Sequence, residues 1–326
     1  MKKIFITGGA GYVGAVLVPK LLENGYIVSV LDLMIYGDKV LQPHPNLDII
    51  KGDIRDQKLL MKVIPDNEIL IHLACISNDP SFELNPRLGK SINLDAFRPL
   101  IEISKNCGVK RFIYASSSSV YGVKSVPNVT EDMLLEPLTD YSRFKADCEK
   151  ILNEYQSENF TAVTIRPATV CGYSPRQRLD VVVNILTNLA FHKRKISVFG
   201  GDQLRPNIHI DDMVEAYVKL IEAPMHKIAG KVFNAGFENQ TVKTLARTVQ
   251  SVVGNDVKLV TTQTEDNRSY HISSEKIKDE LGFVATRSIK DAVKDLCNAF
   301  EKGLLPNSLH DEIYFNIKRM QNISLS

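Results

Sequence analysis

The chain has 326 residues, of which 44% are hydrophobic, and its 40 basic and 38 acidic side chains give a net charge of +2. These values are typical of a globular protein with one large core, and no block of like charge marks a nucleic-acid-binding arm. The longest apolar runs are too short to span a bilayer and no signal-type segment opens the chain, so we expect a cytoplasmic protein without a membrane partner.

The five cysteines are scattered, odd in number and free of any CxxC pair. Neither a disulfide framework nor a metal site is therefore indicated. We expect these cysteines to act as small apolar fillers.

The first half of the chain alternates short apolar runs with longer amphipathic ones. The runs typical of strands are residues 4–7, 27–32, 47–51, 69–74, 111–116 and 161–166. Apolar residues recur at helical spacing in residues 13–24, 57–64, 93–107 and 141–156. This alternation predicts an α/β fold in which helices cover both faces of a parallel sheet.

After about Pro167 the pattern becomes less regular. Helices are expected at residues 180–191, 212–222, 241–253, 273–281 and 288–302. We divide the chain into a first domain, residues 1–166, which receives strand and helix returns from the second half, and a smaller α/β lobe, residues 167–326. The tail, residues 306–326, is amphipathic in part, and we expect it to pack on a neighbour or to fray.

Three glycines, Gly8, Gly11 and Gly14, follow the first predicted strand and open the first predicted helix. The first permits a tight turn, the second lets the backbone approach a pyrophosphate, and the third lets helix and strand pack closely. The helix N-terminus then faces the phosphates. A simple glycine-rich turn would need only one or two of these positions, so the motif predicts a dinucleotide site on a Rossmann-type, doubly wound sheet.

Two acidic residues follow predicted strands near this motif. Asp32 ends the second strand, where a carboxylate accepts hydrogen bonds from the ribose hydroxyls and repels a 2′-phosphate. NAD is therefore favoured over NADP as the cofactor. Asp53 follows the third strand and is a candidate to receive the adenine amino group, although Gly-Asp also makes ordinary turns.

Tyr141 and Lys145 lie one turn apart on the same face of a predicted helix. A nearby ammonium and the positive nicotinamide ring favour a phenolate, which can take a proton from a sugar hydroxyl as hydride leaves its carbon. Alone, the pair is equally compatible with an exposed helix face. The serines at 116–119 add support because they follow a predicted strand, where parallel sheets border a ligand crevice, although a capped turn also uses serine.

With these motifs in this order, the chain resembles the extended branch of the short-chain dehydrogenase/reductase family, the NAD-dependent sugar-nucleotide epimerases, dehydratases and reductases. The resemblance covers Lys2 to about Lys302 and rests on TGGAGYVG, Asp32, GDI at 52–54, HLAC at 72–75, SSSSVYG, YSRFK, RPATVCG from Arg166, HIDD from His209 and FNAG from Phe233. It implies that Ser117 holds the family's Ser/Thr position, that Tyr141 is the acid/base, and that Lys145 binds the nicotinamide ribose. The implied cofactor contacts are Gly8, Gly11, Tyr12, Val13, Gly14, Asp32, Asp53, Ile54, Leu73, Ala74, Tyr141 and Lys145.

One departure from the family pattern narrows the chemistry. The similar 4,6-dehydratases carry an Asp-Glu pair after the Ser/Thr position, whereas this chain has Ser118 and Ser119. Hydroxyls cannot replace a carboxylic acid and a carboxylate base in the elimination of water. Dehydration is therefore disfavoured.

The resemblance also implies a set of substrate contacts in the second half. Arginine forks match diphosphate oxygens, and similar family arginines clamp the diphosphate or nucleotide, although each alone would more often be a surface ion pair. The candidate substrate-binding residues are Ser118, Thr169, Arg178, Asn184, Arg205 and Arg268. Arg166 is interpreted as structural, and residues 75–80 are expected to line the nicotinamide side or to form a plain turn.

Two further departures suggest an unusual substrate. Thr169 stands where many relatives have asparagine, and Arg205-Pro206-Asn207 replaces the usual Arg-Asp-aromatic. The stretch 174–180 resembles a bacterial subgroup that acts on activated heptoses and other surface-polysaccharide sugars.

These features predict an NAD-dependent enzyme that oxidises C4 of a nucleoside-diphosphate sugar. A sugar-nucleotide 4-epimerase is favoured. The alternative is a 4-dehydrogenase or 4-keto reductase that acts on a nucleoside-diphosphate sugar, with heptoses among the candidate sugars. A 4,6-dehydratase and a non-catalytic NAD-sensing protein rank below these. By family analogy we expect a homodimer that pairs through helices 93–107 and 141–156.

Overall fold

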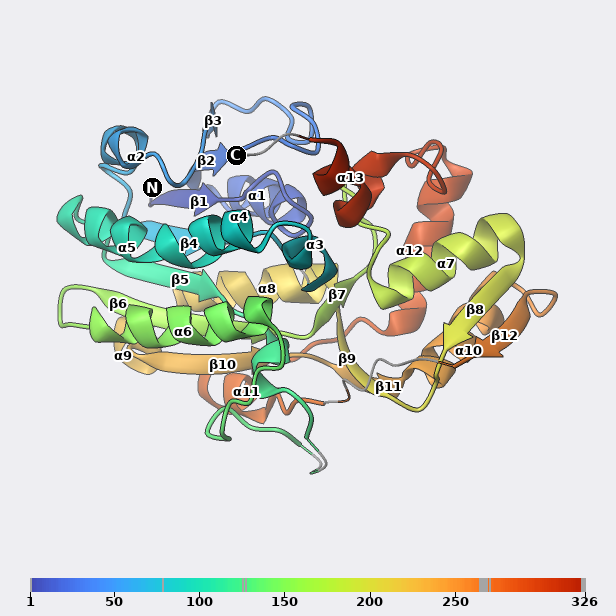
Figure 1. Cartoon of the computed structure of the whole chain (residues 1–326). Coiled ribbons are helices and arrows are strands. Elements are labelled where there is room, and N and C mark those ends of the chain that lie inside the picture. The colour runs from blue at the N-terminus through green and yellow to red at the C-terminus, as the bar shows by residue number, and fades with distance from the viewer. Residues whose placement is uncertain are drawn as a thin grey trace.

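A parallel β-sheet forms the centre of the computed structural model, which describes residues 2–77, 79–124, 126, 128–263, 269 and 271–323. Within this described part, seven strands pair in parallel in the order β10-β6-β5-β4-β1-β2-β3. Their bounds are Lys3–Thr7 (β1), Ile27–Asp32 (β2), Leu47–Lys51 (β3), Ile69–His72 (β4), Arg111–Ala115 (β5), Thr161–Pro167 (β6) and Lys231–Ala235 (β10). The predicted doubly wound α/β fold is confirmed (Figure 1).

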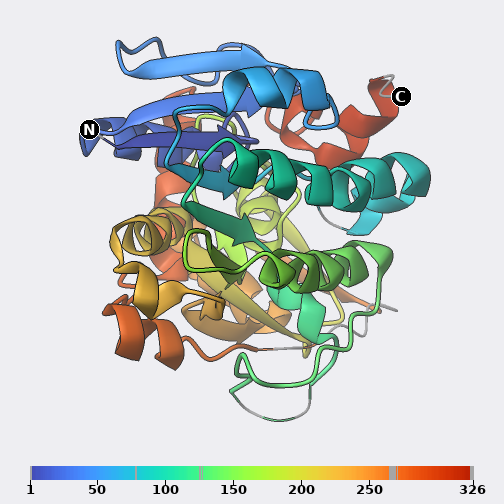
Figure 2. The ribbon, with the colours of Figure 1, turned by 90° about the vertical axis from the view of Figure 1, so that its left-hand side faces the viewer.

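Alternating side chains give the sheet two buried faces. In β1, Ile4 and Ile6 join one apolar cluster and Phe5 joins the other. Helices on the first face include α1 (Gly14–Glu23), α8 (Ile210–Glu222) and α11 (Glu275–Leu281). Helices on the second face include α2 (Gln57–Val63), α5 (Phe97–Asn106) and α6 (Asp140–Glu154). Figures 1 and 2 show the sheet between these two layers, as a buried parallel sheet requires.

The chain order reverses between β1 and β4, which are neighbours in the sheet although β2 and β3 separate them in sequence. In doubly wound sheets a ligand crevice opens at the carboxyl ends of the strands at such a point. The turns that begin at Gly8, Leu73 and Ser116 follow β1, β4 and β5 directly. The topology therefore gathers the predicted motifs at one edge of the sheet.

The smaller lobe contains three packed helices among the described residues, α7 (Val182–Lys193), α10 (Val242–Val253) and α12 (Ile289–Glu301). Its strands form a parallel pair, β8 (Lys195–Phe199) with β12 (Lys258–Thr262), and a three-stranded sheet of β7 (Thr169–Cys171), β9 (Leu204–His209) and β11 (Glu238–Thr241). The strand and helix that were expected to return to the large sheet are β10 and α8.

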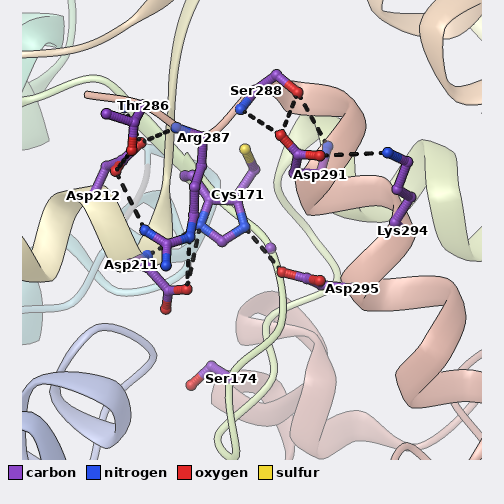
Figure 3. Close-up of polar contacts among 12 residues, drawn as sticks. Cys171, Ser174, Asp211, Asp212, Thr286, Arg287, Ser288, Asp291, Lys294 and Asp295 are labelled. Carbon is purple, nitrogen blue, oxygen red and sulfur yellow. Dashed lines mark hydrogen bonds and ion pairs between the residues drawn. The ribbon is translucent and has the colours of Figure 1, made fainter.

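Polar contacts tie the smaller lobe to α8 (Figure 3). The Asp212 carboxylate, in the first turn of α8, accepts hydrogen bonds from the backbone nitrogens of Arg287 at 2.7 Å and Thr286 at 3.0 Å. Immediately afterwards, Ser288 and Asp291 form a capping box that starts α12. These contacts fix α12 against the helix that backs the large sheet.

The C-terminal segment folds back over the carboxyl ends of the strands. Helix α13 (Asn316–Asn322) lies beside α3 (Asp79–Glu83) in Figure 1. The Asn316 backbone nitrogen donates to Asp180 at 2.8 Å, and Arg319 Nε donates to the Ile35 carbonyl at 2.6 Å. For the described residues 306–323, the expectation of fraying is therefore wrong, because this segment packs on its own chain. Packing of the segment on a neighbour stays a prediction.

The predicted helix at 93–107 begins differently from expectation. A π-helical turn, Ser91–Asp95, precedes α5. The Asn93 side chain accepts a hydrogen bond from the Ile76 nitrogen at 2.8 Å and donates to the Ile76 carbonyl at 2.9 Å. This pair of bonds joins the turn to the segment after β4.

In the described part of the chain, no helix combines the length and apolar character needed to cross a membrane.

Candidate active site

A cavity of about 730 Å³ opens at the carboxyl ends of the parallel strands. The turns after β1, β2, β4 and β5 contribute to its wall, and so does the smaller lobe. Gly8, Asp32, Ser117 and Tyr141 all line it, although the sequence separates the first two from the last two by a long stretch. The fold thus brings the predicted cofactor and catalytic motifs together.

The glycine-rich turn has the backbone geometry that its sequence predicts. Gly8 has a positive φ of 75°, and a Cβ there would lie 2.5 Å from the Ala74 nitrogen. At Gly14 a Cβ would lie 2.4 Å from the Gly9 carbonyl oxygen, so larger residues cannot replace either glycine without a backbone shift. Together with Gly11, these residues line the cavity at the N-terminus of α1. This arrangement can hold a pyrophosphate.

Asp32 lies at the end of β2 and lines the same cavity. Its two carboxylate oxygens accept hydrogen bonds from the backbone nitrogens of Ala10 at 3.0 Å and Met34 at 2.8 Å. Burial raises the pKa of Asp32, and these two backbone hydrogen bonds oppose that shift. Since a carboxylate has about four acceptor sites, the fixed side chain can still accept from ribose hydroxyls.

The remaining predicted cofactor contacts fall into two groups. Those that line the cavity are Tyr12, Val13, Ile54, Leu73 and Ala74. Asp53 is not part of this lining, and Arg55 Nη2 binds its carboxylate at 2.6 Å. Burial alone would raise the pKa of Asp53, but the hydrogen bonds from Arg55 outweigh this effect and lower the pKa. The adenine contact of Asp53 stays a prediction.

Tyr141 and Lys145 project from the first turns of α6. A capping box between Thr139 and Ser142 starts this helix, which sets the position of Tyr141. Lys145 is buried, and its Nζ donates to the Ala115 carbonyl at 2.6 Å. The same Nζ lies 5.9 Å from the centre of the Tyr141 ring. The ammonium is therefore held close to the phenol at the floor of the cavity.

The serine run after β5 has distinct environments at successive positions. Ser117 lines the cavity, and its Oγ lies 2.9 Å from that of Ser119. Ser118 is buried and also contributes to the lining. Ser116 Oγ donates instead to the Glu149 carboxylate on α6. The run therefore presents hydroxyls to the cavity and anchors the end of β5 to α6.

A buried ion pair supports this helix from behind. Arg166 Nη2 lies 2.6 Å from the Glu149 carboxylate, and both side chains are almost fully buried. Arg166 Nη1 also donates to the Tyr121 hydroxyl at 2.7 Å. The interpretation of Arg166 as structural agrees with these contacts.

Four of the predicted substrate contacts line the cavity, and one lies outside the described residues. Thr169, Arg178 and Arg205 line the cavity together with Ser118, and Arg178 Nε binds Asp180 at 2.6 Å. Arg268 lies outside the described residues.

Asn184 requires a correction. It is fully buried and absent from the cavity lining. Its Oδ1 accepts from the Gly172 nitrogen at 3.0 Å, while Nδ2 donates to the Tyr12 hydroxyl at 2.9 Å and to the Arg178 carbonyl at 2.8 Å. Because its amide is fully engaged with the protein, we assign Asn184 to the support of the glycine-rich turn and withdraw it from the substrate contacts.

Sequence reasoning missed a group of lining residues that come from three separate segments. These are Tyr36 after β2, Arg176 and Asp180 in the loop before α7, and Asn316 and Met320 in the C-terminal segment. The stretch 174–180 was recognised only as a subgroup signature. The C-terminal residues gave no signal, because only the tertiary fold brings them to the cavity.

Comparisons with known proteins agree with this geometry. The model of the NAD dependent epimerase/dehydratase family matches residues 4–236. The UDP-glucose 4-epimerase of Corynebacterium glutamicum is 27% identical over 323 residues, covering 93% of this chain and 96% of the relative.

Solved structures extend the similarity to the whole fold. The UDP-glucose 4-epimerase of Thermotoga maritima, with UDP-glucose, has a TM-score of 0.85 at 27% identity and covers 93% of this chain and 99% of that one. The UDP-glucuronic acid 4-epimerase of Bacillus cereus, in complex with UDP-glucuronic acid and NAD, has a TM-score of 0.83 at 25% identity, with 92% and 99% covered.

Proposed function

The chain belongs to the NAD dependent epimerase/dehydratase family, whose cofactor is NAD, and on this basis we propose that it is a nucleoside-diphosphate-sugar 4-epimerase. One observation carries the proposal. Ser117, Tyr141 and Lys145 line the same cavity as the Gly8 turn and Asp32. The Tyr141 phenol lies beside the Lys145 ammonium and shares a cavity with the predicted dinucleotide site, an arrangement suited to alcohol oxidation.

The catalytic roles follow from the contacts of each residue. Bound NAD supplies the hydride acceptor and donor. Tyr141 takes the proton of the sugar 4-hydroxyl, and the Lys145 ammonium favours the phenolate that does so. Ser117 Oγ donates a hydrogen bond to the reacting oxygen. In the return step, Tyr141 gives the proton back after the keto sugar has turned to present its other face.

The cavity lining argues against dehydration. Among the described residues that line it, the carboxylates are Asp32 and Asp180. Asp32 lies at the cofactor strand, and Asp180 is bonded to Arg178 and to the Asn316 nitrogen. Neither follows the Ser117 position, where an eliminating acid and base would be required.

The substrate diphosphate has a plausible set of partners on the lobe side of the cavity. We propose that Arg178 and Arg205 bind its oxygens and that Ser118 and Thr169 contact the sugar. Thr169 and the Arg205-Pro206-Asn207 sequence also favour an unusual sugar such as a heptose. The alternative reaction on such a sugar is that of a 4-dehydrogenase or 4-keto reductase, which needs the same three catalytic residues as the epimerase. That substrate would connect the enzyme to surface-polysaccharide biosynthesis.

A substrate panel tests the proposal. Purified enzyme is incubated with nucleoside-diphosphate hexoses and heptoses, and sugar products and NADH absorbance are followed together. We expect a 4-epimer without net NADH. Net formation or consumption of NADH would support the oxidoreductase alternative, and absence of turnover with every sugar nucleotide would favour the NAD-sensing protein.

We propose a cytoplasmic homodimer that pairs through α5 and α6. These helices lie next to each other on one face of the sheet (Figure 1), which supports a four-helix interface. Light scattering on the eluted protein should give twice the chain mass of 36.5 kDa. A mass of 36.5 kDa at micromolar concentration would contradict the dimer.

A further inference from the structure

Arg176 is a buried cation that forms no ion pair with any carboxylate in the described part of the chain. Its side chain lines the cavity, but the residue is only 5% exposed. Its Nε has no hydrogen-bond partner among the residues that the structure describes. Among the described residues, no carboxylate forms an ion pair with it, in contrast to Arg178, which Asp180 binds at 2.6 Å, and Arg166, which Glu149 binds at 2.6 Å.

Neutral groups from two distant segments hold this guanidinium in place. Its carbon lies 3.4 Å from the centre of the Tyr36 ring, a stacking contact. Its Nη2 donates to Asn316 Oδ1 at 2.7 Å. Asn316 in turn donates through Nδ2 to Ser77 Oγ at 2.8 Å. The C-terminal segment therefore fixes the orientation of Arg176 without neutralising its charge.

A buried charge is costly unless an anion or several hydrogen bonds compensate for it. Asp180 and Asp32 interact electrostatically with Arg176, but among the described residues neither forms an ion pair with it. A ligand in the cavity that Arg176 lines is therefore expected to supply the anion in direct contact with the guanidinium. Arginine forks match diphosphate oxygens in particular. The part of the cavity wall that Arg176 forms is therefore suited to a diphosphate.

Local contacts indicate which diphosphate this is. The loop that carries Arg176 is bonded to the glycine-rich turn, since Ser174 Oγ donates to the Tyr12 carbonyl at 2.8 Å and the Tyr12 hydroxyl donates to the Gly172 carbonyl at 2.7 Å. Tyr36, on which Arg176 stacks, follows the strand that ends in Asp32. Both connections lead to the cofactor side of the cavity.

We propose that Arg176 binds the diphosphate of the dinucleotide cofactor and that Asn316, from the C-terminal segment, is its positioning residue. The inference rests on the dinucleotide site of the proposed function. It also gives the C-terminal segment a role, because an epimerase must keep its cofactor between the oxidation and the reduction. Residues Asn316 and Met320 of α13 line the same cavity, which favours such retention.

Binding measurements on cofactor-stripped full-length protein test this role without turnover. We compare Arg176→Gln and Arg176→Lys with the control Arg194→Gln, which removes an exposed arginine paired with Asp256. Calorimetry with ADP-ribose should show a dissociation constant about 10- to 100-fold higher for Arg176→Gln, a smaller loss for Arg176→Lys, and no change for the control. UDP probes the site of the substrate diphosphate, and its dissociation constant should be the same for the three variants as for the wild-type protein.

Three results would overturn the inference. Weaker UDP binding with unchanged ADP-ribose binding would place Arg176 on the substrate. A lower melting temperature of the free protein with unchanged ADP-ribose binding would show a purely structural role. Unchanged binding of both probes by a folded variant would show no ligand role.

A double-mutant cycle tests the part played by Asn316. Asn316→Ala should weaken ADP-ribose binding in the wild-type background and add little in the Arg176→Gln background, because the two residues act as a unit. Additive losses would contradict a positioning role. Charge-dependent ADP-ribose binding in a protein that turns over no sugar nucleotide would refute the proposed function and leave this inference standing.

Discussion

Tyr141 and Lys145 show how two neighbouring side chains acquire different roles from their surroundings. Lys145 is buried and bonded to the Ala115 carbonyl, whereas Tyr141 is partly exposed at the cavity. The lysine side chain is therefore held in place by the protein, and the tyrosine side chain is the one open to the cavity.

Replacing Tyr141 with Phe should reduce kcat by about 10²- to 10⁴-fold, the usual contribution of a general acid–base group. The dissociation constant of NAD should change little, because the ring is retained. Tyr26→Phe, directly before β2, removes a hydroxyl outside the cavity lining and away from α5 and α6, and serves as control. Full turnover by the Tyr141 variant would remove the proposed role.

His72 gives the stability a defined pH dependence. Burial, with a smaller contribution from the charge of Lys145, lowers the pKa of His72 to about 3. The unfolded chain binds a proton near pH 6.5, so it holds more protons than the folded chain between about pH 6.5 and about pH 3. Stability should fall as pH falls through this window, by about 1.4 kcal/mol per pH unit at its steepest.

Urea unfolding at a series of pH values measures this slope. His72→Gln should reduce it between pH 6.5 and pH 5, whereas His226→Gln, which changes an exposed histidine, should not. Equal slopes for wild type and the His72 variant would show that this residue is not the source.

The residue scale also shows what one sequence cannot provide. The glycine turn, Asp32, Ser117, Tyr141 and Lys145 all reach the cavity, because each follows a strand or opens a helix in a recognisable pattern. Asn184 does not reach the cavity. Neither its spacing nor its residue type reveals that its amide forms hydrogen bonds with Tyr12, Gly172 and Arg178. Arg176 could not be identified for the same reason, since only the folded structure shows that it forms no ion pair among the described residues.

Among the elements, α6 depends on the buried pair between Glu149 and Arg166. Glu149→Gln should lower the free energy of unfolding by about 3–5 kcal/mol, because it leaves the Arg166 charge buried and unpaired. Denaturant unfolding provides the measurement. The loss should also lower kcat, since the same helix carries Tyr141 and Lys145.

Glu275→Gln, on α11, is the control. Glu275 binds Lys278 at 2.9 Å, but both side chains are at least half exposed, so the cost should stay below about 1 kcal/mol. Equal losses for the two glutamate variants would contradict a special contribution from burial.

Element boundaries were predictable where pattern and capping agree. The six strands predicted in the first half appear within two residues of their expected ends, as does the helix at 288–302, which a capping box starts at Ser288. The π-helical turn at 91–95 and the return of residues 306–323 were not predictable. Both depend on contacts between distant segments, such as Asn93 with Ile76 and Asn316 with Ser77.

At the scale of the whole molecule, both halves of the chain line one cavity, so a bound dinucleotide should stabilise the fold as a unit. NAD at 100 times its dissociation constant should add about 2.7 kcal/mol to the free energy of unfolding. NADP at the same concentration should add less, because Asp32 repels a 2′-phosphate. Thermal melts measure both, and a larger shift with NADP would contradict the assigned role of Asp32.

A nucleoside-diphosphate hexose that carries deuterium at C4 gives the most direct test of oxidation at that carbon. With a substrate that the enzyme turns over, NMR of the product should show the 4-epimer with its deuterium still at C4, because the hydride leaves and returns within one active site. A 4-epimer that has lost this deuterium to solvent, or a product with solvent hydrogen at C5, would contradict the mechanism.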